Sequence, residues 1–465
     1  MEVDLLSKSL KNKWYKLFVF ILIPILLTGC NPFSQKKDEA VKLPEIKQKY
    51  SEEQVAEFNN RITYGKTNRY EGLTISNKPM LSQPEKLPNI LYYQSDVQID
   101  YPKDGVRGIY VTADNVANPE VLDNLIAYIN DTELNAMVID FKDDYGNIVA
   151  NINSDNKMVQ DNVISAVDMK TVIKKLEANN IYPIARIVTF KDHMLSDDRP
   201  DLSFHDGETG QIWQDGNGAQ FVNPFSTEVW NYNVNVAIEA AKLGFKDIQF
   251  DYVRFPEGFD VFGSDLQYDI GSYSYFVTDN PDEEGIERVI AISDFLTYAG
   301  EQLKPYGVEI SADVFGYTAI ASNAADVRGI GQDFARMSER VDVMSSMIYP
   351  SHWGDEFFGI YGPDLHPYEV VTAYMDHEKK LFEKVENNVR TRPWIQDFTL
   401  PVPSGLYMTY GPNEVQAQIN ALYNQGIHEY LIWNASGEYT QGVDYAPENT
   451  GNTAPMEETT VQSNF

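Results

Sequence analysis

The chain is poor in cysteine, histidine and positive charge. Its 465 residues include one cysteine and six histidines, and 37 Lys and Arg against 69 Asp and Glu give a formal net charge of −32. One cysteine excludes an intramolecular disulfide. The histidines are scattered without a His-Glu-x-x-His or comparable spacing, so we expect no metal site and no cofactor.

Nucleic acid and anionic membrane surfaces would repel so acidic a chain, and we expect neither as a ligand. The charge is best explained by solubility, with binding of a cationic ligand as the alternative. The acidic stretch 279–284 could be considered as a calcium site, but it lacks the regular spacing of oxygen ligands in an EF-hand. We therefore interpret its carboxylates as solvated charges. Hydrophobic residues make up 43% of the chain and aromatic residues 12%, which is ample for a large core.

The N-terminus has the features of an export signal. Four lysines precede the apolar run Leu17–Leu27 and are Lys8, Lys11, Lys13 and Lys16. The run is short for a spanning helix and contains Pro24, which favours a secretory signal. Leu27-Thr28-Gly29-Cys30 resembles the lipobox of bacterial lipoproteins, which implies a mature protein that begins at Cys30, carries diacylglycerol on it and is anchored in the membrane facing outside the cytoplasm. A plain signal-anchor with an incidental cysteine is the alternative.

The remaining chain divides by composition. We expect residues 1–29 to be the signal peptide, 30–104 a tether and N-terminal arm, 105–440 one folded domain and 441–465 a disordered acidic tail. Within the second segment, 51–62 has the spacing of a short helix, and 73–99 is predicted to be an extended arm lying on the domain.

Strand-like and helix-like segments alternate across the folded domain. The predicted strands are 106–112, 136–141, 182–190, 247–254, 309–315, 341–349, 392–398 and 429–434. The predicted helices are 120–130, 166–178, 227–242, 287–304, 333–340, 368–385 and 413–424. About eight such units predict an α/β fold of the (β/α)₈ TIM barrel type. A doubly wound open sheet would also alternate, but no Gly-rich phosphate loop follows the first strand.

The predicted loops are uneven, since long connections follow strand three (191–226) and strand four (256–285). Both belong to the C-terminal face, where barrels build their sites. Alternation along the strands points Asp140, Lys142, Asp251 and Asp313 toward the barrel axis, while Asp397 is ambiguous in parity. Several carboxylates therefore converge at one end of the barrel, which is what glycoside hydrolysis requires.

Aromatic and cationic residues near the same strand ends are candidates for sugar binding. Flat rings stack on the apolar faces of sugars, and cations lower the pKa of a carboxylate that must stay ionised. The candidate substrate-binding residues are Asp140, Lys142, Arg186, Tyr252, Arg254, Tyr349, His352, Trp353, Trp394, Asp397 and Trp433, with Trp353 the best candidate for a stacking platform. Packing in the core or simple charge balance is the alternative for each.

Six segments together resemble the bacterial putative glycosyl hydrolase domain family over about residues 100–440. They are 140–146, 184–192, 250–256, 311–317, 347–353 and 393–398. The family is distantly similar to alpha-amylase-type barrels, and the resemblance implies a nucleophile at Asp251, an acid at Asp313 and a supporting carboxylate at Asp397. Two departures are Gln249, where amylases have an arginine, and an aspartate rather than a glutamate at 313.

The leading hypothesis is a retaining glycosidase that acts on a polysaccharide outside the membrane. Asp251 would be the nucleophile and Asp313 the acid/base, with carboxyl groups about 5–5.5 Å apart, whereas about 6.5–9.5 Å would indicate inversion. The alternatives are a non-catalytic carbohydrate-binding lipoprotein on a degenerate barrel and a metal-dependent hydrolase such as a deacetylase.

Overall fold

The structure is a computed structural model that describes residues 91–448 apart from 322, 403 and 404. The predicted signal segment, Cys30 and the helix predicted over 51–62 lie outside the described residues. In the part of the chain that is described, no helix is both long and apolar enough to cross a bilayer.

Eight parallel strands of the described chain close into a barrel. They are β1 (Arg107–Val111), β2 (Ala136–Lys142), β5 (Tyr182–Val188), β7 (Asp247–Asp251), β9 (Glu309–Phe315), β10 (Val343–Met347), β12 (Trp394–Gln396) and β13 (Tyr430–Trp433). Each pairs in parallel with the next, and β13 pairs back with β1. This closure confirms the predicted (β/α)₈ fold and excludes the open sheet.

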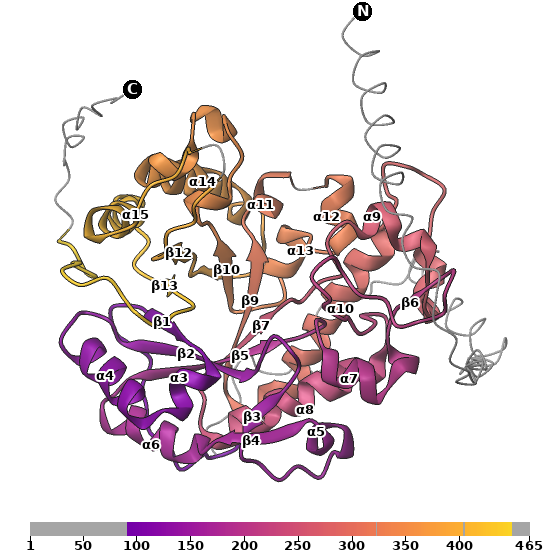
Figure 1. Cartoon of the computed structure of the whole chain (residues 1–465), viewed down its shortest axis with the longest axis horizontal. Helices are drawn as coiled ribbons and strands as arrows, with labels where there is room; N and C mark the ends of the chain where they lie inside the picture. Colours follow the sequence, from indigo (N-terminus) through magenta and orange to yellow (C-terminus); the bar gives the residue numbers. More distant parts are fainter. Residues whose placement is uncertain (1–90, 322, 403–404, 449–465) are drawn as a thin grey trace, which may run out of the picture. The chain divides into compact units, whose positions relative to one another are not determined.

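Helices follow the strands and surround the barrel (Figure 1). The longer ones are α4 (Pro119–Asn130), α6 (Met169–Ala178), α8 (Thr227–Leu243), α10 (Ile286–Leu303), α14 (Pro367–Phe382) and α15 (Pro412–Asn424), with the short α13 (Phe334–Ser338) after β9. Local sequence sets their ends. Helix α8, for example, begins after Ser226, whose side chain accepts from the Val229 N–H, and ends at Gly244 with φ 111°.

Insertions enlarge the C-terminal face of the barrel. After β2 the chain forms β3 (Ile148–Ala150), α5 (Lys157–Asp161) and β4 (Val163–Val167), so residues 166 and 167, predicted helical, lie in a strand. The loop after β5 carries α7 (His193–Asp198) and β6 (His205–Asp206), and the loop after β7 carries α9 (Phe259–Phe262) and β8 (Leu266–Gln267). Strands β6 and β8 pair antiparallel, which joins the two long loops into one small sheet. Shorter elements of this kind are α3 (Ala113–Ala117), α11 (Tyr317–Ala321) and α12 (Ala325–Ile330). The short strand β11 (Arg390–Thr391) instead precedes β12 and pairs in parallel with the first residues of β10.

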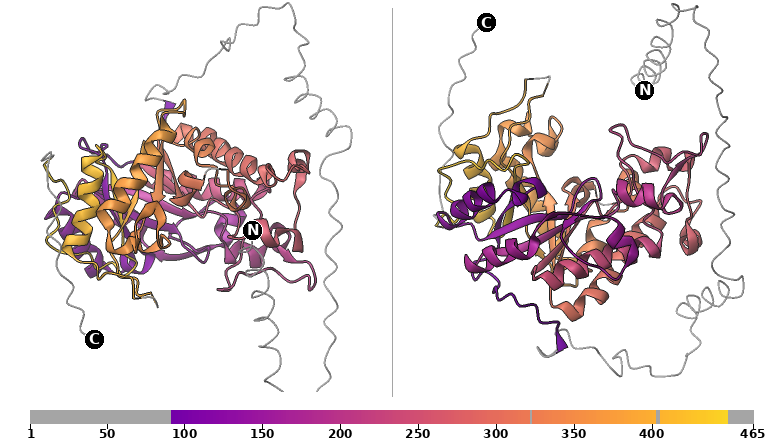
Figure 2. Two further views of the ribbon diagram at one scale, coloured as in Figure 1. Left: turned by 90° about the horizontal axis from the view of Figure 1, so that it is seen from above. Right: turned by 60° about the horizontal axis from the view of Figure 1, so that its bottom comes forward.

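The segment 91–104 lies against the opposite, N-terminal face. It passes the C-terminal ends of α10, α8 and α6, as the right-hand view of Figure 2 shows for the indigo segment. Along it, Tyr93 N–H donates to the Pro305 carbonyl at 2.7 Å, Lys246 Nζ donates to the Val97 carbonyl at 2.9 Å, and Gln98 N–H donates to Glu177 Oε1 at 2.6 Å. These contacts fix the described part of the arm to the barrel.

The packed chain continues beyond residue 440, where composition predicted the start of the tail. Tyr445 is fully buried, and its carbonyl accepts from the Tyr430 hydroxyl at 2.6 Å. Its N–H donates to Glu133 Oε2 at 3.2 Å. Val443 and Tyr445 are thus buried beyond residue 440, where the tail was expected to begin.

Candidate functional site

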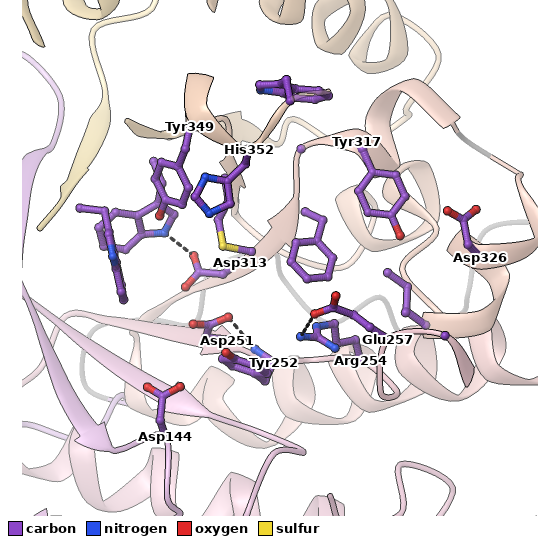
Figure 3. Close-up of a pocket in the computed structure, with 18 of the residues that line it drawn as sticks. Asp144, Asp251, Tyr252, Arg254, Glu257, Asp313, Tyr317, Asp326, Tyr349 and His352 are labelled. Atoms are coloured by element: carbon purple, nitrogen blue, oxygen red, sulfur yellow. Dashed lines mark hydrogen bonds and ion pairs between the residues drawn. The ribbon is translucent and has the colours of Figure 1, made fainter. Parts of the chain in front are cut away.

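A cavity of about 730 Å³ opens at the C-terminal ends of the strands (Figure 3). It is lined by Asp144, Arg186, Asp251, Tyr252, Arg254, Glu257, Gly258, Asp260, Val261, Asp313, Phe315, Gly316, Tyr317, Asp326, Ile330, Met347, Tyr349, His352, Trp353, Trp394 and Trp433. The structure thus brings both predicted catalytic residues and eight of the predicted substrate-binding residues together. Three others, Asp140, Lys142 and Asp397, are not part of the lining.

Asp251 and Asp313 occupy equivalent positions on neighbouring strands. The pairing of β7 with β9 sets Asp247 opposite Glu309 and Phe250 opposite Ala312, and one further step of this register sets Asp251 beside Asp313. Neighbouring strands lie about 4.7–4.9 Å apart. Figure 3 shows the two carboxyl groups facing the same part of the cavity, so they can act on one bond.

Asp251 is held by three N–H donors. Arg186 donates through Nε at 2.9 Å and through Nη2 at 2.7 Å, both to Oδ2. The backbone N–H of Tyr252 donates to Oδ1 at 2.6 Å. Tyr252 has φ 47°, a left-handed conformation that is uncommon for a bulky residue, at the point where the chain leaves β7. These donors face the oxygens as an ionised carboxylate requires.

Asp313 has a different environment. It is 2% exposed, and its Oδ1 accepts a hydrogen bond from Trp394 Nε1 at 2.8 Å. Burial and the nearby Asp251 carboxylate raise the pKa of Asp313 well above its usual range, and the Trp394 hydrogen bond and Arg186 only partly oppose them. The raised pKa favours the neutral, protonated form of Asp313, which is the form a general acid needs. Because the indole is only a donor, it occupies Oδ1 and leaves the proton on Oδ2.

Arg186 balances three carboxylates from the barrel interior. Besides Asp251, its Nη1 contacts Asp140 Oδ1 at 2.7 Å and Asp144 Oδ2 at 3.0 Å. Its guanidinium carbon lies 5.5 Å from the ring centre of Trp433, a cation–π contact. The side chain is 2% exposed, so this charge is compensated by protein groups rather than by water.

The two carboxylates beside Asp251 differ in depth. Asp140 is 4% exposed, accepts from the Tyr110 hydroxyl at 2.7 Å and lies beneath the cavity rather than in its wall. Asp144 lines the cavity, and sequence reasoning missed it. Burial raises the pKa of Asp144, but Arg186 and Lys191 outweigh burial and lower it to about 2. Asp144 follows β2 in a loop, beyond the reach of strand alternation.

Lys142 does not face the cavity, which corrects the prediction. A bulge between Asp140 and Lys142 shifts the register of β2 against β5 and reverses the alternation. Lys142 is fully buried, forms an ion pair with Asp192 Oδ2 at 2.6 Å and donates to Asn233 Oδ1 of α8 at 3.1 Å. It holds the loop after β5 and has no access to a substrate.

Asp397 is also turned away from the cavity. Its two oxygens accept from Thr440, from the N–H at 2.9 Å and from Oγ1 at 2.5 Å. Strand β12 ends at Gln396, so Asp397 begins the following loop and is directed to the C-terminal segment. The structure assigns it a contact within the protein instead of the predicted support of the sugar.

The aromatic candidates build the cavity walls. The Tyr252 ring makes cation–π contacts with two side chains, with Lys191 Nζ 4.5 Å and the Arg254 guanidinium carbon 4.8 Å from its centre. Burial, and then the charges of Asp313 and Asp251, raise the pKa of Tyr349 well above its usual range, so its hydroxyl stays protonated. His352 has its pKa lowered by burial and is neutral near pH 7.

Acidic residues of the loops form one end of the cavity and were not predicted. Glu257 and Asp260 follow β7, and Asp326 follows β9. Arg254 contacts Glu257 Oε1 at 3.0 Å. Figure 3 places Asp326 at one end of the drawn site and Asp144 at the other, with Asp251 and Asp313 between them. Carboxylates in loops carry no periodic signal, so these three could not be selected from the sequence pattern.

Across the described part of the chain, no three His, Cys, Asp or Glu side chains are grouped as ligands of a metal ion.

The model of the family described as "Putative glycosyl hydrolase domain" matches residues 108–439. Curated protein sequences yielded no match. Among solved structures, the crystal structure of a hypothetical protein from Ruminiclostridium thermocellum ATCC 27405 is 31% identical, with 48% of this chain and 98% of that chain covered and a TM-score of 0.37. The PgaB (BpsB) glycoside hydrolase domain from Bordetella bronchiseptica is 14% identical, with 71% and 94% covered and a TM-score of 0.49. The spore cortex-lytic enzyme SleL of Bacillus cereus is 14% identical, with 72% of each chain covered and a TM-score of 0.39.

Proposed function

We propose that this chain, which belongs to the putative glycosyl hydrolase domain family and is a glycosidase, cleaves a polysaccharide by a two-carboxylate, retaining mechanism. The observation that carries the mechanism is the contrast between its two cavity carboxyl groups. Asp251 receives three N–H donors, and Asp313 is buried with a raised pKa. Such a pair supplies one ionised carboxylate and one neutral acid at the same pH.

In the first step, Asp313 Oδ2 gives its proton to the oxygen of the glycosidic bond as that bond breaks. A carboxylate oxygen of Asp251 attacks the anomeric carbon and forms a glycosyl-enzyme ester. In the second step, Asp313, now ionised, takes a proton from water, the water oxygen attacks the same carbon, and the ester bond to Asp251 breaks. Arg186 and the Tyr252 N–H hold the attacking carboxylate, and Trp394 orients the acid.

The strand register favours retention over inversion. Inverting enzymes need about 6.5–9.5 Å between their carboxyl groups to fit a water molecule, and retaining enzymes need about 5–5.5 Å. Asp251 and Asp313 project from neighbouring strands, whose spacing is about 4.7–4.9 Å. Proton NMR of the first product formed checks this point, since retention gives the anomer of the substrate and inversion gives the opposite one.

The size and walls of the cavity support a carbohydrate polymer as the substrate. Its volume of about 730 Å³ lies within the usual range of roughly 300–1,000 Å³ for ligand sites. Its wall contains both aromatic rings and acidic groups. Rings can cover the apolar faces of sugars, while carboxylates accept from hydroxyls.

Release of reducing ends from a broad glycan panel tests the proposal. The wild-type chain is compared with Asp251→Asn, which removes the charge at nearly constant shape. We expect turnover by the wild type only, with glycan binding retained in the variant. Binding by both chains and turnover by neither would instead support a non-catalytic carbohydrate-binding protein.

The site of action is a second part of the proposal. The basic and apolar N-terminal segment and Leu27-Thr28-Gly29-Cys30 support export and lipidation of Cys30, which would place the enzyme on the membrane, facing outside the cytoplasm. Metabolic labelling with palmitate and cell fractionation check this. Label and membrane association should be lost in Cys30→Ala, and a labelled, membrane-bound Cys30→Ala chain would contradict it.

A further inference from the structure

Tyr145 is half exposed in a loop that contributes to the wall of the cavity. It follows Asp144, a lining residue, in the loop after β2, and its side chain is 50% exposed. Large apolar side chains on the surface are ordinary when isolated, but this one lies on the face that holds the site. Three features distinguish Tyr145 from an incidental surface residue: the ring stacked against it, the hydrogen bonds that hold its backbone, and its place in the loop after β2.

The backing is the imidazole of His193, the first residue of α7. The two ring centres are 4.3 Å apart and the planes differ by 23°, so one face of the tyrosine ring is covered by a stacked partner. The exposed half of the side chain therefore includes the opposite face. A flat apolar face with a polar hydroxyl at its tip is suited to the C–H face of a sugar and its hydroxyls.

The backbone of Tyr145 is fixed before any ligand arrives. Its N–H donates to Asp143 Oδ1 at 2.9 Å, and its carbonyl accepts from the His193 N–H at 2.9 Å and from the Met194 N–H at 3.2 Å. The next residue, Gly146, has φ 99°, and a Cβ there would lie 2.1 Å from Asp192 Oδ1. Asp192 is in turn held by the buried Lys142 at 2.6 Å. A platform that is already ordered loses little freedom on binding.

A chain of contacts gives the position of Asp144, the residue before Tyr145, relative to the reacting bond. Asp144 contacts Arg186 at 3.0 Å, and Arg186 contacts Asp251 at 2.7 Å. Tyr145 thus lies on the Asp144 side of the cavity, outside its wall. A sugar unit on Tyr145 is therefore not the unit attacked by Asp251 but one farther along the same glycan.

We propose that Tyr145 is a stacking platform for an outer sugar unit, so that the preferred substrate is a glycan long enough to reach from Asp251 past Asp144. This inference rests on the proposed function and deepens it, since it names a binding position beyond the cavity and a preference for long substrates.

The test uses the full chain and separates binding from turnover. Affinity electrophoresis in gels containing dextran, hydroxyethyl cellulose or glycol chitosan measures polymer binding by Asp251→Asn with and without Tyr145→Ala. Hydrolysis assays compare the wild type with Tyr145→Ala on the polymer that is cleaved and on a short aryl glycoside of the same sugar. Tyr145→Phe keeps the ring, and Tyr361→Ala removes a 63% exposed tyrosine that does not line the cavity, so both serve as matched controls.

We expect Tyr145→Ala to weaken polymer binding and raise KM on the polymer about 10-fold, with kcat and the aryl glycoside kinetics within about twofold of wild type. Both controls should behave as wild type. Cleavage by the wild type with an unchanged polymer KM in Tyr145→Ala would overturn the platform and leave the proposed function standing. A chain that neither binds nor cleaves any polymer would overturn both. Polymer binding without cleavage, weakened by Tyr145→Ala, would support the platform and overturn the hydrolase mechanism.

Discussion

Arg186 directs two of its nitrogens to the same oxygen of Asp251, Nε at 2.9 Å and Nη2 at 2.7 Å. The other oxygen receives only the Tyr252 N–H, at 2.6 Å. One oxygen of the carboxylate is thus anchored, while the other keeps more of its lone-pair capacity for a substrate. On the neighbouring strand, Asp313 accepts a hydrogen bond from Trp394 on one of its oxygens, and the charge of Arg186 lowers its pKa only in part against burial and Asp251.

Trp394 should tune the alkaline limit of activity. Asp313 must be protonated to act as the acid, so kcat/KM falls as the pH rises through its pKa. The Trp394 hydrogen bond favours the ionised form and lowers that pKa, so Trp394→Phe should raise the pKa of Asp313 and move the alkaline limb to higher pH. The measurement is the pH profile of kcat/KM. Trp433→Phe, which alters another indole of the cavity, is the control, and a limb that stays in place or moves to lower pH would contradict the assignment.

The buried pair Lys142–Asp192 should act on stability rather than on substrate binding. Lys142→Met leaves the Asp192 carboxylate without its cation in the core, which should lower the free energy of unfolding by about 3–5 kcal/mol. Adding Asp192→Asn removes the unpaired charge while an amide still caps α7, so the double variant should regain much of the loss. Urea unfolding measures both. A stable double variant that no longer binds a glycan bound by the wild type would contradict this assignment, because it would show that Lys142 contributes to binding.

Regular strands explain what could be predicted from the sequence. Asp251 and Asp313 lie on β7 and β9, which pair without a bulge, so alternation placed both correctly at the top of the barrel. In β2 the same rule was right for Asp140 and wrong for Lys142, because the bulge between them reverses the faces. A one-residue irregularity depends on packing against β5 and α8 and leaves no mark in the hydrophobic pattern.

The features of the site that could not be predicted depend on irregular loops and on contacts between residues distant along the chain. Asp144, Glu257 and Asp326 belong to irregular segments, in which neither period nor parity assigns a direction. The resemblance implied different roles for the two central carboxyl groups, but the physical cause of their difference was beyond the sequence. It depends on Arg186 reaching one of them and Trp394 the other, from strands far apart along the chain.

Glu309 should make stability depend on pH. It begins β9 at the N-terminal face, where burial and the Asp247 carboxylate raise its pKa to about 7 against the opposing effect of Arg392 and Arg390. A pKa that is higher in the folded state means that the stabilisation is complete below the usual glutamate pKa of about 4.3 and is lost as the pH rises to about 7. Glu309→Gln should therefore flatten the fall in unfolding free energy across this window.

Urea unfolding at several pH values across the window checks this, with Glu301→Gln on the exposed face of α10 as the control. The control should keep the wild-type slope. A Glu309→Gln chain whose stability falls with pH as steeply as that of the wild type would show that other groups carry the dependence.

The most direct test of the account is azide rescue of Asp251→Ala on a glycan that the wild type cleaves. If Asp251 is the nucleophile and Asp313 still protonates the leaving oxygen, azide occupies the space of the lost carboxylate. It then attacks the anomeric carbon from the side on which the Asp251 carboxylate attacks in the wild type. We predict that hydrolysis is lost by at least about 10³-fold and that azide restores turnover, giving a glycosyl azide whose anomeric configuration is opposite to that of the substrate. Undiminished hydrolysis by Asp251→Ala, or a rescued product of unchanged configuration, would contradict the account.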